Sequence, residues 1–299
     1  MKKNKIDVFS AISEGELKTV MAWLIPSLEK QEKIDRIDLC LINYTGKGQI
    51  YTGPEKIGKV FIKEIKANKN LGFGESHNFA FKKVKPENVF LIINPDIYLH
   101  KDCIAHMVRK FESDKAIGIV EGRQLPFEHP KEYDKKTGET PWASGACMMI
   151  RSEFFKKSGG FDDKFWMYEE DVDLSWRAWV DGYKVLYCPS AVAYHYTGIY
   201  FGYSGTRYNI EHLWSVRNFI YLMFKYWGLK GEKEAISYFR KVGYPVDFQA
   251  ACLAKYKELR TTLNEEDFGL LRQKTRKGLQ VEAVGFNQFK FKKGKKLKK

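Results

Sequence analysis

The stretch FWMYEEDVDLSWRAWVDGY, residues 165–183, places four acidic residues in five positions directly after a run of aromatic residues. Apolar residues from Val172 to Tyr183 recur at the spacing of one helix face, which predicts an amphipathic helix. Asp173 and Arg177 lie four residues apart on another face, so we expect an ion pair at the surface of that helix. The remaining acids fall at its first turn, where unpaired amide groups and the helix dipole favour negative charge.

Two interpretations of the crowded acids Glu169, Glu170 and Asp171 stay open from this stretch alone. Capping of the helix accounts for some of them. Crowding beside apolar rings also raises the pKa of a carboxyl group while the helix terminus lowers it, which yields a group that takes up a proton near neutral pH. The second interpretation makes this turn a candidate catalytic site.

Short apolar segments alternate with amphipathic ones through the first half of the chain. Apolar runs predict strands at residues 6–12, 37–43, 59–65, 88–94, 116–122 and 142–151. Helical spacing of apolar residues predicts helices between them, at residues 16–31, 74–84 and 102–112. This alternation is typical of an α/β fold with a mostly parallel sheet flanked by helices.

Three regions follow from these patterns. Residues 1–205 are predicted to form the α/β domain, residues 206–285 a helical C-terminal extension, and residues 286–299 a basic tail. The last ten residues hold seven lysines and no acid, a charge block typical of an interaction tail. We expect Lys290 to Lys299 to contact an anionic membrane surface, and we expect no nucleic-acid partner.

Composition restricts the class of protein. With 44% hydrophobic and 29% charged residues among 299, the chain is not predicted to be disordered. Five cysteines without a CxxC pair and a polar N-terminus indicate a reduced, cytoplasmic protein. The basic tail adds the expectation that it is peripheral at the inner face of the plasma membrane. The longest aromatic and apolar run, Phe219 to Phe224, is far shorter than the ~20 residues of a membrane-spanning helix.

Two turns follow strands of the predicted sheet. The sequence NPD, Asn94 to Asp96, ends the most apolar strand, and ligands gather at the carboxyl ends of strands in open parallel sheets. Asp96 there is suited to a hard divalent cation, although NPD equally suits a β-turn with proline at its second position. NLGFGESHN, Asn70 to Asn78, is either a phosphate-binding turn or a plain loop before a helix.

Taken in order, these segments resemble the inverting glycosyltransferases of family 2, which have the GT-A fold and move sugars from nucleotide donors. The resemblance covers residues 6–228 and is strongest from Ala143 to His195, where ASGA, GGFDD, FWMYEEDVDL and a strand ending in histidine follow one another. NPD, NLGFGESHN and the Arg217-Asn218 pair resemble the rhamnosyltransferase-like branch. The expected fold is therefore of the GT-A type.

The resemblance implies a metal site and a general base. Asp96 stands at the last acid of the family's DxD motif, Asn94 replaces its first acid, and His195 stands where a histidine completes the site, so Asp96 and His195 should bind Mn²⁺ or Mg²⁺. Asp171 matches the general base, which takes the proton of the acceptor hydroxyl, and Glu170 shapes the site beside it.

The resemblance also implies one set of residues that bind the donor and another set that bind the acceptor. The side chains and backbone that bind the donor are expected to be Asn43, Asn70, Gly72, Asn78, Asn94, Asp96 and Arg207. Those that bind the acceptor are expected to be Ser144, Gly145, Trp166 and Tyr168, the last two by stacking on sugar.

The leading hypothesis is an inverting glycosyltransferase that moves rhamnose or another hexose from a nucleotide diphosphate sugar to a glycan or lipid-linked acceptor in bacterial polysaccharide synthesis. The first alternative is a non-catalytic membrane-surface or nucleic-acid binding protein, which the +14 charge and the abundant aromatics suit. A second alternative is a glycoside hydrolase with Asp96 and Asp171 on either side of the bond. A requirement for a nucleotide sugar distinguishes the transferase from the hydrolase.

Overall fold

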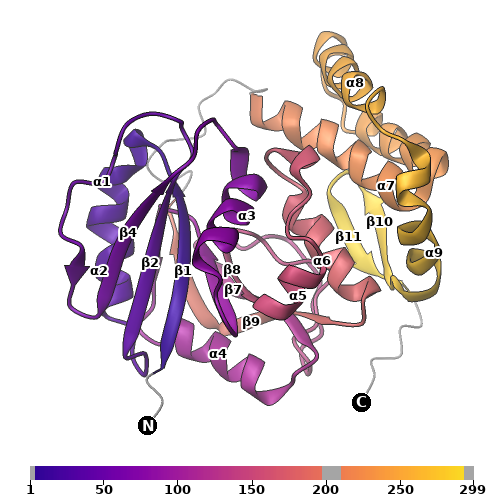
Figure 1. Cartoon of the computed structure of the whole chain (residues 1–299). Coiled ribbons are helices and arrows are strands. Elements are labelled where there is room, and N and C mark those ends of the chain that lie inside the picture. The colour runs from indigo at the N-terminus through magenta and orange to yellow at the C-terminus, as the bar shows by residue number, and fades with distance from the viewer. Residues whose placement is uncertain (1–3, 197–209, 293–299) are drawn as a thin grey trace.

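The computed structural model describes residues 4–196 and 210–292. Its main sheet has nine strands in the order β3-β4-β2-β1-β5-β8-β7-β9-β6 (Figure 1). The strands are β1 (Lys5–Ile12), β2 (Arg36–Asn43), β3 (Lys56–Ile57), β4 (Val60–Lys66), β5 (Val89–Ile93), β6 (Ile97–Leu99), β7 (Ile117–Leu125), β8 (Cys147–Arg151) and β9 (Lys184–His195). Every apolar run that predicted a strand contributes to this sheet.

The two halves of the sheet differ in strand direction. Strands β4, β2, β1 and β5 run parallel, as the alternation of strands and helices predicts. β8 runs antiparallel to both β5 and β7, and β6 runs antiparallel to β9. A loop and not a helix joins β7 to β8, so this connection does not impose the parallel direction of a βαβ unit. The fold is therefore α/β with a mixed sheet.

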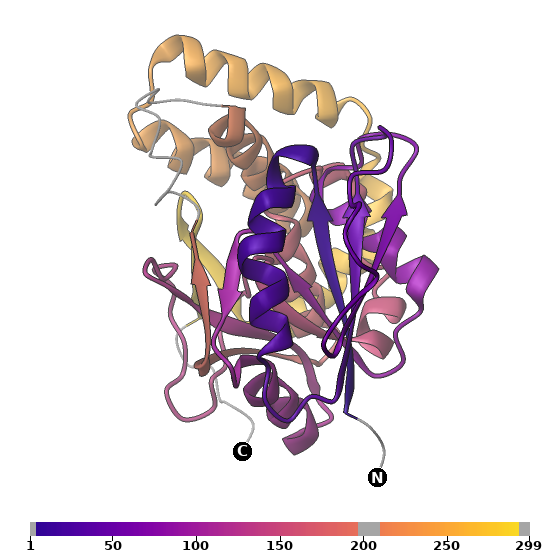
Figure 2. The same cartoon turned by 90° about the vertical axis from the view of Figure 1, so that its left-hand side faces the viewer.

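Helices cover both faces of the sheet. One face carries α4 (Cys103–Ser113) and a continuous helical segment made of η1 (Glu14–Glu16), α1 (Leu17–Thr19), η2 (Val20–Leu24) and α2 (Ile25–Glu29), which Figure 2 shows beside the strands. The other face carries α3 (Gly72–Val84), α5 (Ser152–Lys157) and α6 (Glu170–Val180). The strands are buried on both faces, which explains their continuous apolar runs.

The C-terminal region packs against α6. It consists of α7 (Ile210–Lys241), α8 (Val246–Arg260), η4 (Glu265–Phe268), α9 (Gly269–Gly278) and a hairpin of β10 (Val281–Gly285) with β11 (Gln288–Phe291). Figure 1 shows these elements together at one side of the sheet. Phe289 of the hairpin is buried, with its ring centroid 5.1 Å from that of Trp176 in α6. The helical extension is thus confirmed, but residues 288–291 of the expected tail are a strand of its core.

Asp173 is buried, which corrects the expectation of a surface ion pair. Its carboxylate does meet Arg177, at 2.8 Å, and it also pairs with Lys225 of α7 at 2.7 Å. Lys225 pairs in turn with Asp162 at 2.7 Å. The sequence alone predicts an exposed ion pair because it does not reveal that α7 covers this side of α6.

Two further expectations concern the chain as a whole. Within residues 4–196 and 210–292, no helix has the length and apolar character needed to cross a membrane. All five cysteines are buried and none is in a disulfide. The predicted domain boundary near residue 205 lies outside the described residues.

Candidate active site

The candidate metal residues meet because two strands pair. β6 and β9 are antiparallel, and the turn before β6 brings Asp96 next to His195 at the end of β9. Asp96 Oδ1 lies 3.3 Å from His195 Nε2, and both side chains are mostly buried. The two residues that the resemblance assigns to one cation therefore lie side by side.

The neighbours of His195 fix which of its nitrogens can bind a cation. Its Nδ1 lies 2.9 Å from Oε1 of the buried Gln124 on β7, while Gln124 Nε2 donates to Glu121 at 3.4 Å. Because a carboxamide oxygen only accepts, Nδ1 carries a proton, which leaves Nε2, on the side of Asp96, as the nitrogen that a cation could bind. A carboxylate oxygen suits Mn²⁺ or Mg²⁺, and Mn²⁺ is the one of the two that more readily accepts an imidazole nitrogen as well.

The two residues would not complete a cation's coordination alone. Among the residues that the structure describes, no group of three or more His, Cys, Asp or Glu side chains converges. Cations of this kind are commonly held by one or two carboxylates together with substrate phosphates and water. The observed donor set fits such a cation, provided that a phosphorylated ligand supplies further oxygens.

Asp171 lies in the first turn of α6 with its carboxylate held by backbone amides. Oδ2 accepts from Gly145 N at 2.9 Å, and Oδ1 accepts from Val172 N at 2.8 Å. Burial raises the pKa of Asp171, and these two amides together with the charge of Lys131 lower it in part. The result is a carboxylate suited to take up a proton.

The small-residue loop before β8 connects the two candidate centres. Gly145 N donates to Asp171, whereas the next residue, Ala146, accepts from Asn94 N at 2.9 Å. A side chain at Gly145 would come within 2.9 Å of the Phe73 ring, so glycine suits this position. Ser144 and Gly145, expected to bind the acceptor, thus use their backbone to hold acidic side chains.

Glu169 and Glu170 are buried beside Asp171, and each has a carboxylate oxygen with no hydrogen bond. Burial and the adjacent charge of Asp171 raise the pKa of both well above the ordinary value. Both are therefore favoured in the protonated form, while Asp171 has amide donors that stabilise its charge. Of the two interpretations of the crowded acids, the perturbed-pKa one accounts for Glu169 and Glu170 better than capping, because the N-cap residue Glu169 makes no side-chain hydrogen bond to the helix.

The turn that precedes α6 has a strained backbone. Trp166, Tyr168 and Glu169 have φ values of 50°, 70° and 68°, which non-glycine residues rarely adopt. The side-chain amide of Asn218 in α7 holds the turn, with Nδ2 at 2.6–2.8 Å from the carbonyl oxygens of Phe165, Met167 and Tyr168. The C-terminal region thus supports the segment that presents the acids.

Helix α3 supports the same turn from the other side. Phe73 N donates to Trp166 O at 2.8 Å. Gly72 has φ of 67°, and a side chain there would clash with that carbonyl oxygen, so only glycine fits. Trp166 stacks near Trp214 with ring centroids 4.8 Å apart, and Tyr168 is 36% exposed. Both predicted acceptor aromatics therefore lie on this turn.

The other predicted donor residues have protein partners. Asn43 Nδ2 donates to Gly48 O at 2.8 Å and to Glu64 Oε1 at 2.9 Å, while its Oδ1 accepts from Thr45. Asn70 Oδ1 accepts from Gly72 N at 3.1 Å. Asn43 would have to exchange these bonds to bind a nucleotide base.

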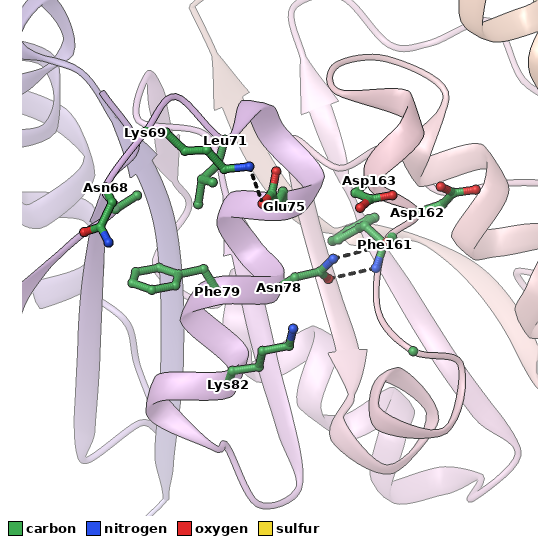
Figure 3. Close-up of a pocket in the computed structure, with 12 residues that line it drawn as sticks. Asn68, Lys69, Leu71, Glu75, Asn78, Phe79, Lys82, Phe161, Asp162 and Asp163 are labelled. Carbon is green, nitrogen blue, oxygen red and sulfur yellow. Dashed lines mark hydrogen bonds and ion pairs between the residues drawn. The ribbon is translucent and has the colours of Figure 1, made fainter. Parts of the chain in front are cut away.

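Asn78 joins α3 to the GGFDD turn, as Figure 3 shows. Its side-chain amide donates to Phe161 O and accepts from Phe161 N, both at 2.8 Å. Beside it lies a cavity of about 630 Å³ whose lining includes Asn68, Lys82 and Asp163 but none of Asp96, Asp171 and His195. The cavity is separate from the candidate metal pair, and Arg207 lies outside the described residues.

Sequence reasoning missed several polar residues of this region. Glu121, Gln124 and Lys131 lie close to Asp171 or His195, and Glu16 acts on Asp96 from the segment after β1. A single acid in the apolar run AIGIVEG was a readable signal for Glu121. For Glu16 the signal was the capping-box spacing from Ser13, which the structure confirms.

Comparison with known proteins shows what parts of the chain resemble. Residues 55–175 match the model of Glycosyl transferase family 2. The rhamnosyltransferase WbbL of Escherichia coli is 26% identical over 160 residues, which are 42% of this chain and 61% of that protein. The N-acetylglucosaminyl-diphospho-decaprenol L-rhamnosyltransferase of Mycobacterium tuberculosis is 44% identical over 55 residues, 18% of each chain. The chain thus spans less than two thirds of either curated relative.

A solved structure supports the fold. The mannosyltransferase PcManGT of Pyrobaculum calidifontis, in complex with GDP-Man and Mn²⁺, aligns with a TM-score of 0.55 at 12% identity and covers 90% of this chain and 86% of its own. At that identity the likeness supports the fold alone. The structure thus has a GT-A type of fold, and residues 55–175 of the chain are similar to glycosyl transferase family 2.

Proposed function

We propose that this protein transfers a sugar from a nucleotide diphosphate donor to an acceptor hydroxyl with inversion at the anomeric carbon. The observation that carries the proposal is the tripeptide 144–146. Its Gly145 amide donates a hydrogen bond to the Asp171 carboxylate, and its Ala146 carbonyl accepts one from the turn that contains Asp96. A proton-accepting carboxylate and a cation-binding pair are therefore joined to adjacent residues, as a single displacement requires.

Asp171 is the general base in this proposal. Its carboxylate accepts the proton of the acceptor hydroxyl as that oxygen attacks the anomeric carbon from the face opposite the leaving nucleotide. Glu170, protonated, leaves Asp171 as the charged acid of the turn. Trp166 and Tyr168 offer aromatic faces for a sugar ring, and the two supports of their turn keep these faces in place.

Asp96 and His195 would hold Mn²⁺ or Mg²⁺, and Gln124 would keep His195 in the tautomer that ligates. Such a cation, when bound, offsets the negative charge that gathers on the leaving diphosphate. We take this class of donor and cofactor from the mannosyltransferase of similar fold, which was solved with GDP-Man and Mn²⁺.

The acceptor is proposed to be a glycan or a lipid-linked sugar in bacterial polysaccharide synthesis, reached at the cytoplasmic face of the membrane. The relative named for a diphospho-decaprenol acceptor supports this class. The lysines at residues 293–299 would then attract anionic lipid. Deleting residues 293–299, which spares the hairpin core, should weaken binding to anionic vesicles; undiminished binding would refute the role of the tail.

The transfer reaction tests the assignment of the base. We expect Asp171→Asn to reduce transfer by about 10²–10⁴-fold while donor affinity stays close to that of the wild type. Asp163→Asn, on an exposed carboxylate of the neighbouring turn, is the matched control and should keep full activity. Loss of donor binding in Asp171→Asn would show that Asp171 is not the base.

A further inference from the structure

A buried lysine lies in the loop that joins β7 to β8. The side chain of Lys131 is 4% exposed, and its ammonium forms an ion pair with Glu121, which is 2% exposed. The same ammonium lies 3.8 Å from the ring centroid of Trp142 and donates to the Trp142 carbonyl at 3.3 Å. Burial of a charge is costly unless it is paired, so this placement needs a reason.

The ion pair is linked to the candidate base through consecutive backbone amides. The amide of Ser144 hydrogen-bonds to Glu121, and the next amide, Gly145 N, donates to Asp171. The charge of Lys131 acts on Asp171, and the charge of Asp171 acts on Lys131. The lysine is close enough to influence the base, yet no step proposed above uses it.

We propose that Lys131 is a positioning residue for sugar transfer: its ammonium, fixed by Glu121 and Trp142, keeps Asp171 in the ionised form that accepts the acceptor's proton. The inference rests on the proposed role of Asp171 as base. Lys131 touches neither of the candidate metal residues in the contacts described. It acts through its electric field at a site from which water is largely excluded.

The charges that surround Asp171 determine the sign of the effect. Asp171 is faced by ionisable groups from its own helix, from β7 and from the loop: Glu169, Glu170, Glu121 and Lys131. Glu169 and Glu170 are favoured in the protonated form because burial raises their pKa. The lysine stabilises the charge of Asp171, and Glu121 opposes part of that stabilisation.

The test is the pH dependence of kcat/KM for transfer. The acid limb of this profile reports ionisation of the base in the free enzyme. Lys131→Met removes the favourable charge, so the limb should move to higher pH by about one unit, the lower end of what a nearby opposite charge produces. Glu121→Gln removes the carboxylate that keeps the buried ammonium of Lys131 charged, so the limb should also move to higher pH, by less than in Lys131→Met because the opposing charge of Glu121 is lost as well.

Two controls and a second test variant keep the test decisive. Lys131→Arg keeps the charge and should leave the limb near that of the wild type, and Lys135→Met, on an exposed lysine of the same loop, should leave it unchanged. If Lys131→Met does not fold, Glu121→Gln alone still tests the direction. A limb that stays unchanged in both Lys131→Met and Glu121→Gln overturns the proposal, because a purely structural lysine would lower activity without moving it.

Failure of this inference differs from failure of the proposed function. If the wild type transfers sugar, Asp171→Asn does not, and the limb stays fixed, then only the role of Lys131 is wrong. If Asp171→Asn remains active, the base itself is assigned incorrectly and the role of Lys131 falls with it.

Discussion

At the scale of single residues, adjacent acids of the same turn have different environments. The Asp171 carboxylate accepts hydrogen bonds from two backbone amides and lies in the electric field of Lys131. Glu169 and Glu170 each have a buried carboxylate oxygen without a hydrogen bond. The sequence shows that the acids are crowded. It does not show which of them is stabilised, because Lys131 and Gly145 lie far from them along the chain.

We expect Glu169→Gln to stabilise the fold at neutral and higher pH. Burial raises the pKa of Glu169 in the folded state, so the folded protein binds this proton more tightly than the unfolded chain does. Stability from this group is present below its unfolded pKa and is lost as pH rises through its folded pKa. Glutamine mimics the protonated form, so Tm should rise by a few degrees at pH 8 and hardly change at pH 4.

Thermal unfolding of both proteins across this pH range checks the expectation. Glu153→Gln, on an exposed acid of α5, is the control and should have the same Tm as the wild type at each pH. A lower Tm for Glu169→Gln at pH 8 would mean that the glutamate is ionised in the folded protein.

At the scale of elements, the strained turn 166–169 is held between α3 and α7. Gly72 and Phe73 support it from one side and Asn218 from the other. Sequence patterns predicted α3 and α6 because their apolar residues recur at helical spacing. The turn 166–169 has no hydrophobic periodicity, so its backbone conformation was not predictable. The loop before β8 has none either, so the antiparallel direction of β8 was not predictable.

We expect Asn218→Ala to lower kcat more than it raises KM for the donor. The variant removes the donor group shared by three carbonyl oxygens, so the turn relaxes and the aromatic faces and Asp171 lose their positions. The free energy of unfolding should fall by about 1–3 kcal/mol, the cost of leaving buried polar groups unsatisfied. Steady-state kinetics and urea unfolding measure the two effects.

Asn88→Ala, on an exposed asparagine before β5, is the matched control for both measurements. If Asn218→Ala lost stability but kept the kcat of the wild type, the bonds from α7 would serve the fold alone.

At the scale of the whole molecule, the C-terminal region and the sheet domain share one core around α6. Trp176 packs on Phe289, and Lys225 joins the carboxylates of Asp162 and Asp173. The sequence predicted both the helical extension and a separate tail, but it did not show that residues 288–291 belong to the core. Contacts between segments so distant in the chain are set by tertiary packing, which local patterns do not encode.

The sequence located the acidic residues of the candidate site better than it located the nucleotide contacts. The pairing of Asp96 with His195 and the place of Asp171 on the first turn of α6 agree with the expected geometry, although their roles stay proposals. The expected nucleotide contacts stay predictions, and Asn43 and Asn78 are held by hydrogen bonds within the protein. Motifs locate the acids well because their chemistry demands particular residue types, whereas backbone contacts to a ligand leave little trace in side chains.

In the proposed site, Asp96 and His195 would bind a nucleotide diphosphate sugar through a divalent cation beside the proposed base Asp171. The most direct measurement is the change in Tm with UDP-, GDP-, CMP- and dTDP-linked sugars, each with Mn²⁺, with Mg²⁺ and with chelator, for the wild type, Asp96→Asn and Asp171→Asn. We expect a cation-dependent rise in Tm with one nucleotide class, which Asp96→Asn loses and Asp171→Asn keeps. No rise with any donor, or the same rise with chelator and in Asp96→Asn, would contradict it.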